Sequence, residues 1–262
     1  MITIKNYVLP NTLEEAYTIL NEKRNNVILG GAAFLRMGSK KIETAIDLSQ
    51  LNLKYIEENE EEIEIGAMTT FREIEINPIL KKYFNAVLPK SVENIVGVQF
   101  RNVVTVGATV YSRYGFSDFI TALLSLDADV LLYKEGRISL EEYLEKGAKK
   151  DLLVKVIIPK TPRKAAFQMM RNSSSDYAIL NVAVSNKEGD FKIAVGARPN
   201  RGKIAKEASL YLSKSSKSME EIEKAASMVA EELSFGSNMR GSKEYRQAIC
   251  KVLVKRAIME VL

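Results

Sequence analysis

Apolar positions near the N-terminus of this 262-residue chain follow first a helical and then a strand-like spacing. The positions at helical spacing are Leu13, Ala16, Tyr17 and Leu20. Asn11 suits the N-cap of that helix, because Glu14 stands three residues further on and completes a capping-box-like pair. The short, mainly apolar segment 26–29 and the strand-like segment 44–48, which contains Asp47, predict short strands. The first 50 residues therefore predict alternating helix and strand.

The middle of the chain is divided by capping residues and turns. Segments 53–57 and 63–66 flank an acidic tip and predict a hairpin. Further on, short helices are expected after Thr69 or Thr70, after Asn77, at 91–96 before Gly97, and from Ser117–Asp118 to Leu126. Strands are expected at 103–110, which is rich in β-branched residues, at 129–133 and at 152–158.

The pattern changes after Thr161-Pro162-Arg163, which predicts a domain boundary. Three strand candidates follow at 165–171, 179–185 and 191–197, and the last two are joined by a turn at 187–190. Helical segments then dominate, at 205–212, 219–233 and 242–262. Strands followed by helices predict an α+β domain over residues 163–262, which leaves 1–162 as a first domain.

Composition excludes several classes of chemistry. The chain has no histidine and one cysteine, Cys250. Ser-His-Asp catalysis and the commonest zinc sites need histidine, and an iron–sulfur cluster usually needs four thiolates. We therefore expect no metal site and no catalytic residue, and any redox chemistry must come from an organic cofactor. Cys250 lies among apolar helical positions, where an inert thiol is expected.

Charge and hydropathy bear on partners and location. The net charge of +5 is spread along the chain without the basic stripe that nucleic-acid binding needs. No apolar run approaches the length that spans a bilayer, and the N-terminus lacks a signal-peptide core. We expect a cytoplasmic protein that binds neither nucleic acid nor membrane.

Two glycine-containing loops are the candidate binding elements. The apolar strand at 27–29 runs into Gly30-Gly31, where missing side chains let phosphate oxygens approach backbone N–H groups. Thr105-Val106-Gly107-Ala108-Thr109 is interpreted as a strand with a small-residue break, again suited to close approach of a ligand. Taken singly, each is also explained by an ordinary turn or bulge, and neither matches the dinucleotide fingerprint or a Walker A loop.

Four ordered motifs resemble the FAD-binding medium subunits of molybdenum hydroxylases, of the xanthine, carbon monoxide and nicotinate dehydrogenase type. Leu29-Gly30-Gly31 corresponds to the family's A-G-G-T, and the segment from Gln99 to Ala108 is similar to Q-I-R-N-x-G-T-I-G-G-N. Ser117-Asp118 with 122–128 resembles S-D…A-L-L-A-L-D-A. Gly241 to Arg246, with the helix after it, resembles the closing S-A-E-Y-R segment.

The resemblance implies an α+β fold in which two lobes, about 1–55 and 56–162, clamp extended FAD, followed by a smaller α+β C-terminal domain. It implies that this chain takes electrons from [2Fe–2S] clusters of a partner chain, beside a molybdopterin-binding large subunit, and passes them to NAD(P)+ or another acceptor. The cofactor contacts that it implies are Ile28, Leu29, Gly30, Gly31, Ala32, Ala33, Phe34, Thr105, Val106, Gly107, Ala108, Thr109, Ser112, Asp118 and Leu153. Asp118 is open to a second interpretation as part of a helix N-cap.

The chain departs from the family pattern at several polar positions. Ala32, Ala33, Ala108 and Thr109 stand where relatives carry Thr or Ser, a polar residue, Gly and Asn. The lysine that relatives often carry in the strand after the boundary corresponds to Met170, with Arg171 beside it. These losses motivate a rival hypothesis, a structural or assembly subunit that has lost FAD. A third is a different FAD enzyme of the same clamp-like fold, such as a cell-wall precursor reductase.

Overall fold

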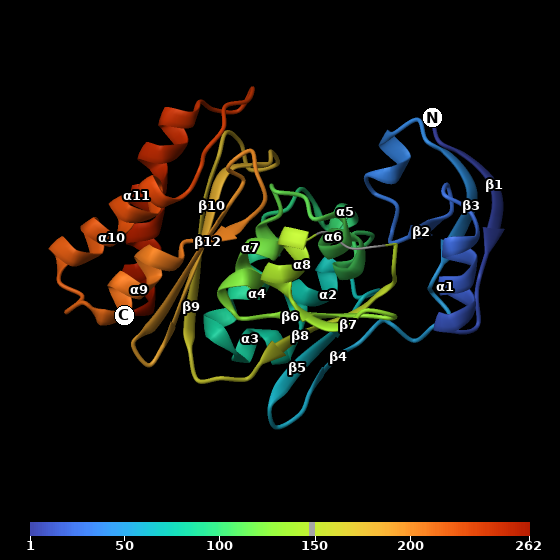
Figure 1. Cartoon of the computed structure of the whole chain (residues 1–262), viewed down its shortest axis with the longest axis horizontal. Helices are drawn as coiled ribbons and strands as arrows, with labels where there is room; N and C mark the ends of the chain where they lie inside the picture. Colours follow the sequence, from blue (N-terminus) through green and yellow to red (C-terminus); the bar gives the residue numbers. More distant parts are fainter. Residues whose placement is uncertain (147–149) are drawn as a thin grey trace.

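The computed structural model describes residues 1–146 and 150–262, whose strands form three sheets with helices packed against each (Figure 1). The first sheet, in the N-terminal lobe, is parallel with the order β1-β3-β2. The lobe's elements are β1 (Thr3–Val8), α1 (Leu13–Glu22), β2 (Val27–Leu29), the 3₁₀ helix η1 (Leu35–Met37) and β3 (Lys41–Asp47). Its small core is Ala16, Leu20, Ile46, Leu48, Leu53 and Leu152, the last of which returns from far along the chain.

The predicted start of the first helix is wrong by one residue. The N-cap is Thr12, whose hydroxyl accepts a hydrogen bond from the N–H of Glu15, and the Glu15 carboxylate accepts one from the N–H of Asn11. Thr12 takes the capping position because it also carries an oxygen that suits a cap, and the Glu15 carboxylate reaches back past it to Asn11.

The second sheet has the order β4-β5-β8-β6-β7, and all of its neighbouring strands are antiparallel. Its strands are β4 (Ile56–Glu58), β5 (Glu62–Gly66), β6 (Asp129–Leu132), β7 (Gly136–Ser139) and β8 (Leu153–Pro159). The helical segments packed with it are α2 (Phe71–Ile76), α3 (Pro78–Lys82), η2 (Phe84–Ala86), α4 (Val87–Glu93), α5 (Val98–Arg101), α6 (Val106–Ser112), α7 (Asp118–Ser125) and α8 (Leu140–Lys146). The predicted hairpin and the strands at 129–133 and 152–158 are confirmed.

The strand expected at 103–110 is wrong, because this segment enters helix α6. The hydroxyl of Thr105 caps the helix by accepting a hydrogen bond from the N–H of Ala108. Val106 and Val110, one helical turn apart, are both fully buried, so packing outweighs the strand preference of β-branched residues. The helix expected at 91–96 is also displaced: α4 spans Val87–Glu93.

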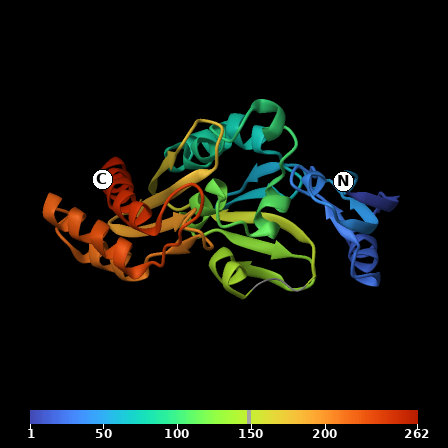
Figure 2. The same ribbon diagram turned by 90° about the horizontal axis from the view of Figure 1, so that it is seen from above.

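The third sheet is antiparallel with the order β12-β11-β10-β9. Its elements, with the helices on its outer face, are β9 (Lys164–Arg171), β10 (Ala178–Lys187), β11 (Asp190–Gly196), β12 (Lys203–Ile204), α9 (Lys206–Lys214), α10 (Met219–Glu232) and α11 (Lys243–Val261). Helix α7 packs on the inner face, so this sheet lies between α9–α11 and the middle of the molecule (Figures 1 and 2). The predicted α+β class is confirmed.

Buried polar groups tie the last helix to this sheet. Arg246 of α11 is fully buried and donates hydrogen bonds to the carbonyl oxygens of Ile179, Gly236 and Gly241, and to Asn238 Oδ1. Cys250 is also buried, and desolvation raises the pKa of its thiol to about 12. Of the helices in the described ranges, none has the length and hydropathy needed to cross a bilayer.

Candidate cofactor site

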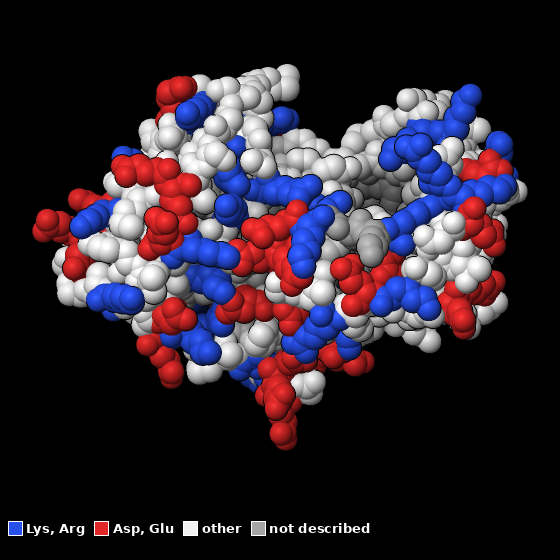
Figure 3. Space-filling model, in the orientation of Figure 1, with Lys and Arg blue, Asp and Glu red and all other residues white. Residues whose placement is uncertain are grey.

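A cavity of about 620 Å³ lies where the N-terminal lobe, the middle of the chain and the third sheet meet. Its volume is within the usual range for small-molecule and cofactor sites. The hollow beside the N-terminal lobe is visible in Figure 3, where lysine and arginine side chains stand on that lobe's face. Residues of two hydrophobic cores and of the segment 171–177 line this cavity, which makes it the candidate site.

The structure brings most of the predicted contact residues together at this cavity. Those that line it are Ile28, Gly30, Ala32, Ala33, Phe34, Thr105, Gly107, Ala108, Thr109, Ser112, Asp118 and Leu153. Three predicted residues lie behind its surface: Leu29 pairs with Asp47 of β3, Gly31 packs on the carbonyl of Val103, and the Val106 side chain is fully buried.

The first glycine loop presents free backbone donors. Gly31 and Ala32 both have positive φ angles, +75° and +54°. Within the described residues, the N–H groups of Gly31, Ala32 and Ala33 have no hydrogen-bond acceptor. Successive free N–H groups in such a turn form a concavity that binds anions, and a non-glycine residue at positive φ is strained in a way often found at functional sites.

The second glycine segment differs, because its N–H groups are already used within the protein. Val106 N–H donates to Thr69 O at 2.9 Å, Gly107 N–H to Ala67 O at 2.7 Å and Thr109 N–H to Thr105 O at 3.1 Å. The N–H of Ala108 donates to the capping hydroxyl of Thr105 at 3.3 Å. The N–H groups from Val106 to Thr109 are therefore already used, and this part of the segment offers a ligand side chains such as the Thr109 hydroxyl.

Glycine at position 30 lets the two segments touch. A Cβ there would stand 2.4 Å from Ala108 Cβ and 2.8 Å from Thr105 Oγ1. A Cβ at Gly31 would stand 1.5 Å from the carbonyl oxygen of Val103. The two glycines thus let the N-terminal lobe pack directly against the segment that leads into α6 and against α6 itself. We call this contact the seam; Gly30 and Ala108 line the cavity there.

Asp118 lies at the cavity wall and is buried together with its partners. Its Oδ1 accepts a hydrogen bond of 2.6 Å from Asn181 Nδ2, and its Oδ2 is ion-paired with the Arg171 guanidinium. Burial raises the pKa of this carboxyl to about 6, against the opposing effects of Arg171 and the Asn181 hydrogen bond. The N-cap of α7 is Ser117, whose hydroxyl accepts from the N–H of Ile120, so Asp118 does not serve as the cap.

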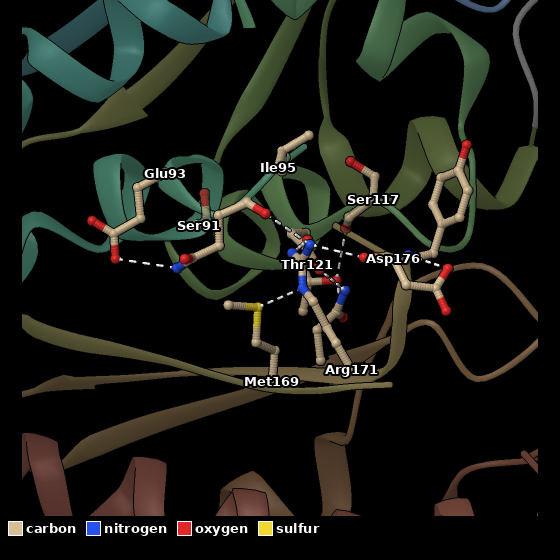
Figure 4. A network of polar contacts seen from close by, with 12 residues as sticks. Ser91, Glu93, Ile95, Ser117, Thr121, Met169, Arg171 and Asp176 are labelled. Carbon is tan, nitrogen blue, oxygen red and sulfur yellow. Dashed lines mark hydrogen bonds and ion pairs between the residues drawn. The ribbon is translucent and has the colours of Figure 1, made fainter. Parts of the chain in front are cut away.

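Arg171 joins several segments at this wall (Figure 4). It stands at the end of β9, and only its position beside Met170, where relatives often carry a lysine, marked it in the sequence. Its guanidinium reaches Asp118, the carbonyl oxygens of Asn94 and Asp176, and Met169 Sδ. No local motif signals these contacts, because their partners come from distant parts of the chain.

An aromatic cluster lines another part of the cavity. The ring of Phe34 lies 5.3 Å from Tyr114, 5.8 Å from Phe116 and 6.5 Å from Tyr177, between centroids. Phe116 and Tyr177 meet edge to face at 4.6 Å. Among these, only Phe34 was a predicted contact; we call Phe34, Tyr114, Phe116 and Tyr177 the aromatic wall.

Cationic side chains complete the lining on the side of the N-terminal lobe. Lys40 and Lys150 both line the cavity, and Lys150 Nζ donates to the carbonyl oxygen of Lys23 at 2.6 Å. No group of three or more His, Cys, Asp or Glu side chains suited to a metal ion is found among residues 1–146 and 150–262. The arrangement suits an elongated ligand with an anionic centre and large planar ends.

Residues 3–161 match the family described as the FAD binding domain in molybdopterin dehydrogenase. The chain belongs to this family of FAD-binding domains. Residues 165–261 match the C-terminal domain of the CO dehydrogenase flavoprotein. The predicted family, the FAD cofactor and the class, a subunit of an oxidoreductase complex, are confirmed.

Relatives in this family match almost the whole chain. The nicotine 6-hydroxylase medium subunit of Paenarthrobacter nicotinovorans is 26% identical, with 97% of this chain and 96% of the relative covered. The glyceraldehyde dehydrogenase medium chain of Sulfolobus acidocaldarius is 25% identical, with 97% of each chain covered. Among solved structures, the Cu,Mo-CO dehydrogenase in its cyanide-inactivated form has a TM-score of 0.91 at 22% identity, covering 100% of this chain and 98% of that one. That likeness shows the fold.

Proposed function

We propose that this chain is the electron-transferring flavoprotein subunit of a molybdenum-hydroxylase-type complex. In this role it takes electrons from [2Fe–2S] clusters of a partner chain, beside a molybdopterin-binding large subunit, and passes them to NAD(P)+ or another acceptor. The observation that carries the proposal is the run of free N–H groups at Gly31, Ala32 and Ala33 beside a cavity of cofactor size. The cytoplasmic location expected from the sequence stays a prediction.

We place the pyrophosphate of FAD over this run of donors. Bound in this way, FAD would be held by the residues of the predicted set that line the cavity on both sides of the contact between Gly30 and Ala108. We take 1–162 as the FAD-binding domain, with lobes at about 1–55 and 56–162, and 163–262 as the C-terminal domain. The family matches over 3–161 and 165–261 support these bounds.

The chain's own residues bind and orient the cofactor in this mechanism. Bound FAD supplies the redox chemistry, because the flavin ring carries the electrons. The free N–H groups and Lys40 oppose the charge of the pyrophosphate, while the aromatic wall excludes water. No side chain needs to act as an acid or a base. The metal steps belong to partners, since the sequence has no histidine and a single cysteine.

A binding experiment tests the proposal. The purified chain, stripped of ligand and titrated with FAD, is expected to turn yellow and to quench or shift the flavin signal at one equivalent. Chemically reduced holoprotein mixed anaerobically with NAD+ is then expected to form NADH, unless the acceptor is another carrier. A chain that stays colourless with excess FAD would overturn the proposal.

That colourless outcome is what the second candidate function predicts. Ala32 and Ala33 lack the polar side chains that relatives carry, and Ala108 and Thr109 replace a Gly and an Asn, which favours a structural subunit without FAD. The free backbone donors argue against it, because they bind phosphate without any side chain. A cell-wall precursor reductase of clamp-like fold is the third candidate, and it predicts that the isolated holoprotein reduces its substrate without partner chains.

A further inference from the structure

Arg171 connects four separate segments at one wall of the cavity (Figure 4). Its Nη1 donates to Asn94 O, after α4, and to Asp176 O, each at 3.0 Å. Its Nη2 pairs with Asp118 at the start of α7, and its Nε donates to Met169 Sδ at 3.0 Å. The side chain is 8% exposed, so its contacts with Asp118, Asp176 and Met169 are largely shielded from water, whereas the one with Asn94 lies at the surface.

One of these segments is the turn at 172–177 between β9 and β10. Its other hydrogen bonds are Asp176 N–H to Ser173 O, Tyr177 N–H to Asp176 Oδ1 and Arg240 Nε to Asp176 Oδ1. All of these involve the turn's own residues or Arg240. Arg171 is therefore the side chain that ties this turn to α4 and α7.

The turn carries one ring of the aromatic wall. Tyr177 follows Asp176 directly, lines the cavity and meets Phe116 edge to face. Its other face is covered by the Arg240 guanidinium, at 4.8 Å from the ring centroid. The place of this ring relative to Phe34 and Phe116 thus depends on how firmly the turn is held.

We propose that Arg171 is a positioning residue that fixes the 172–177 turn, and with it the Tyr177 ring, as part of the wall against FAD. This rests on the proposed function, because the wall bears on the cofactor only when FAD lies in the cavity. Asp118 orients the guanidinium from the opposite side, and Asn181 orients Asp118.

The geometry requires arginine at this position. The acceptors at Asn94, Asp118 and Asp176 lie around one planar guanidinium, whose five N–H groups reach several acceptors at once. A lysine ammonium keeps the charge beside Asp118 but lacks the planar fork, in which Nη1 reaches both carbonyl oxygens while Nη2 pairs with Asp118. Arg171→Lys thus keeps the positive charge but removes the bridge between segments, and Arg171→Gln removes both the charge and the bridge.

The matched control is Arg163→Lys, near the opposite end of the same strand. The Arg163 side chain is 3% exposed, pairs with Asp127 and donates to Ser125 O at 3.1 Å, so it is similarly buried and bridged. It has no contact with the 172–177 turn.

The first test needs no cofactor. The full-length chain without FAD is digested briefly with chymotrypsin, and mass spectrometry measures cleavage after Tyr177 and, as an internal reference, after the exposed Tyr7. Arg171→Lys is expected to speed cleavage after Tyr177 about tenfold, with Tyr7 unchanged, because cleavage follows the population of the opened turn. Arg163→Lys is expected to match the wild type at both sites.

The second test uses bound FAD. The visible absorption and circular dichroism of the flavin depend on the aromatic wall around it. A general loss of stability does not change these spectra as long as the protein stays folded. Arg171→Lys and Arg171→Gln are expected to change these spectra in the same way, and Arg163→Lys to preserve them.

Three outcomes would overturn the inference. They are wild-type cleavage after Tyr177 in Arg171→Lys, an equal rise in Arg163→Lys, and unchanged flavin spectra in both Arg171 variants. A wild-type chain that binds no FAD overturns the proposed function and with it the role of the wall toward a cofactor, whereas the cleavage rates still decide whether Arg171 holds the turn.

Discussion

Gly30 packs so closely on Ala108 that a Cβ at position 30 would stand 2.4 Å from the Ala108 methyl carbon. This contact joins the N-terminal lobe to helix α6 at the floor of the cavity. It explains why glycine is needed at position 30, although the φ angle of Gly30 is not positive.

The variant Gly30→Ala is expected to push the lobe away from α6 and to weaken FAD binding by about tenfold or more, since ~1.4 kcal/mol of strain is enough for that factor. Gly202→Ala is the control, because Gly202 lies outside this cavity and the nearest neighbour of the added methyl group would be Leu124 Cδ1, the end of a side chain, at 3.3 Å. Isothermal titration with FAD gives both affinities. The double variant Gly30→Ala, Ala108→Gly removes the methyl clash and should recover part of the loss; no recovery would contradict this account of the seam.

The two threonines of α6 are expected to separate stability from binding. Thr105→Val removes the N-cap hydroxyl and should cost about 1 kcal/mol, which lowers Tm by roughly 2–4 °C in a chain of this size. Thr109→Val removes a hydroxyl that lines the cavity, so it should leave the Tm of the FAD-free chain unchanged while weakening FAD binding. Thermal unfolding with and without FAD measures both. Equal loss of Tm in the two FAD-free variants would contradict the division of roles.

Asp118 should impose a pH dependence on stability. Its pKa is raised to about 6 by burial, above the value near 4 of an unfolded chain, so the folded state holds the proton between these values. Its contribution to the free energy of unfolding is therefore full below pH 4 and is lost as the pH rises through 6. The difference in Tm between wild type and Asp118→Asn should be larger at pH 4.5 than at pH 7.

The control for this dependence is Asp176→Asn. Arg240 and the Tyr177 N–H lower the pKa of the Asp176 carboxyl, so its stabilising contribution is present throughout pH 4.5–7 and is lost only in stronger acid. Its difference in Tm from the wild type should be flat over that range. A flat difference for Asp118→Asn as well would show that the buried carboxyl does not titrate near 6.

Arg246 is expected to be the main anchor of the last helix. Arg246→Met leaves the carbonyl oxygens of Ile179, Gly236 and Gly241 without their donor, and such losses in the interior cost about 3 kcal/mol or more, or roughly 6–12 °C in Tm. Tyr245→Phe, at the half-exposed neighbouring position, should change Tm little. Comparable shifts in the two variants would contradict the anchoring role.

The order and type of most elements could be predicted because caps and turns are local signals. Ser117, Thr70 and Asn77 each start a helix where the sequence places one. Helix α6 was missed because its valines favour a strand, and only the burial of Val106 and Val110 on one face decides the outcome. Thr12 replaced Asn11 as a cap because both residues carry a suitable oxygen.

Most residues of the candidate site could be predicted from the ordered motifs. The other residues come together only through tertiary contacts. The glycine segments that the resemblance singled out line one cavity, but the resemblance did not show that the second uses its N–H groups from Val106 to Thr109 within the protein. Phe116, Tyr177 and Arg171 come from segments that meet only in the folded chain. Nothing in their local sequence marks them as neighbours.

The N-terminal lobe has by far the smallest of the three hydrophobic cores, and Leu152 from another lobe completes it. A unit with so little buried apolar surface opens at low free-energy cost, so its amides should exchange hydrogen sooner than those of the third sheet. A ligand that spans the seam binds only the closed form, and it stabilises that form in proportion to the logarithm of its concentration. If FAD occupies the site as proposed, slower hydrogen exchange of the lobe's amides would therefore report that the cofactor is bound.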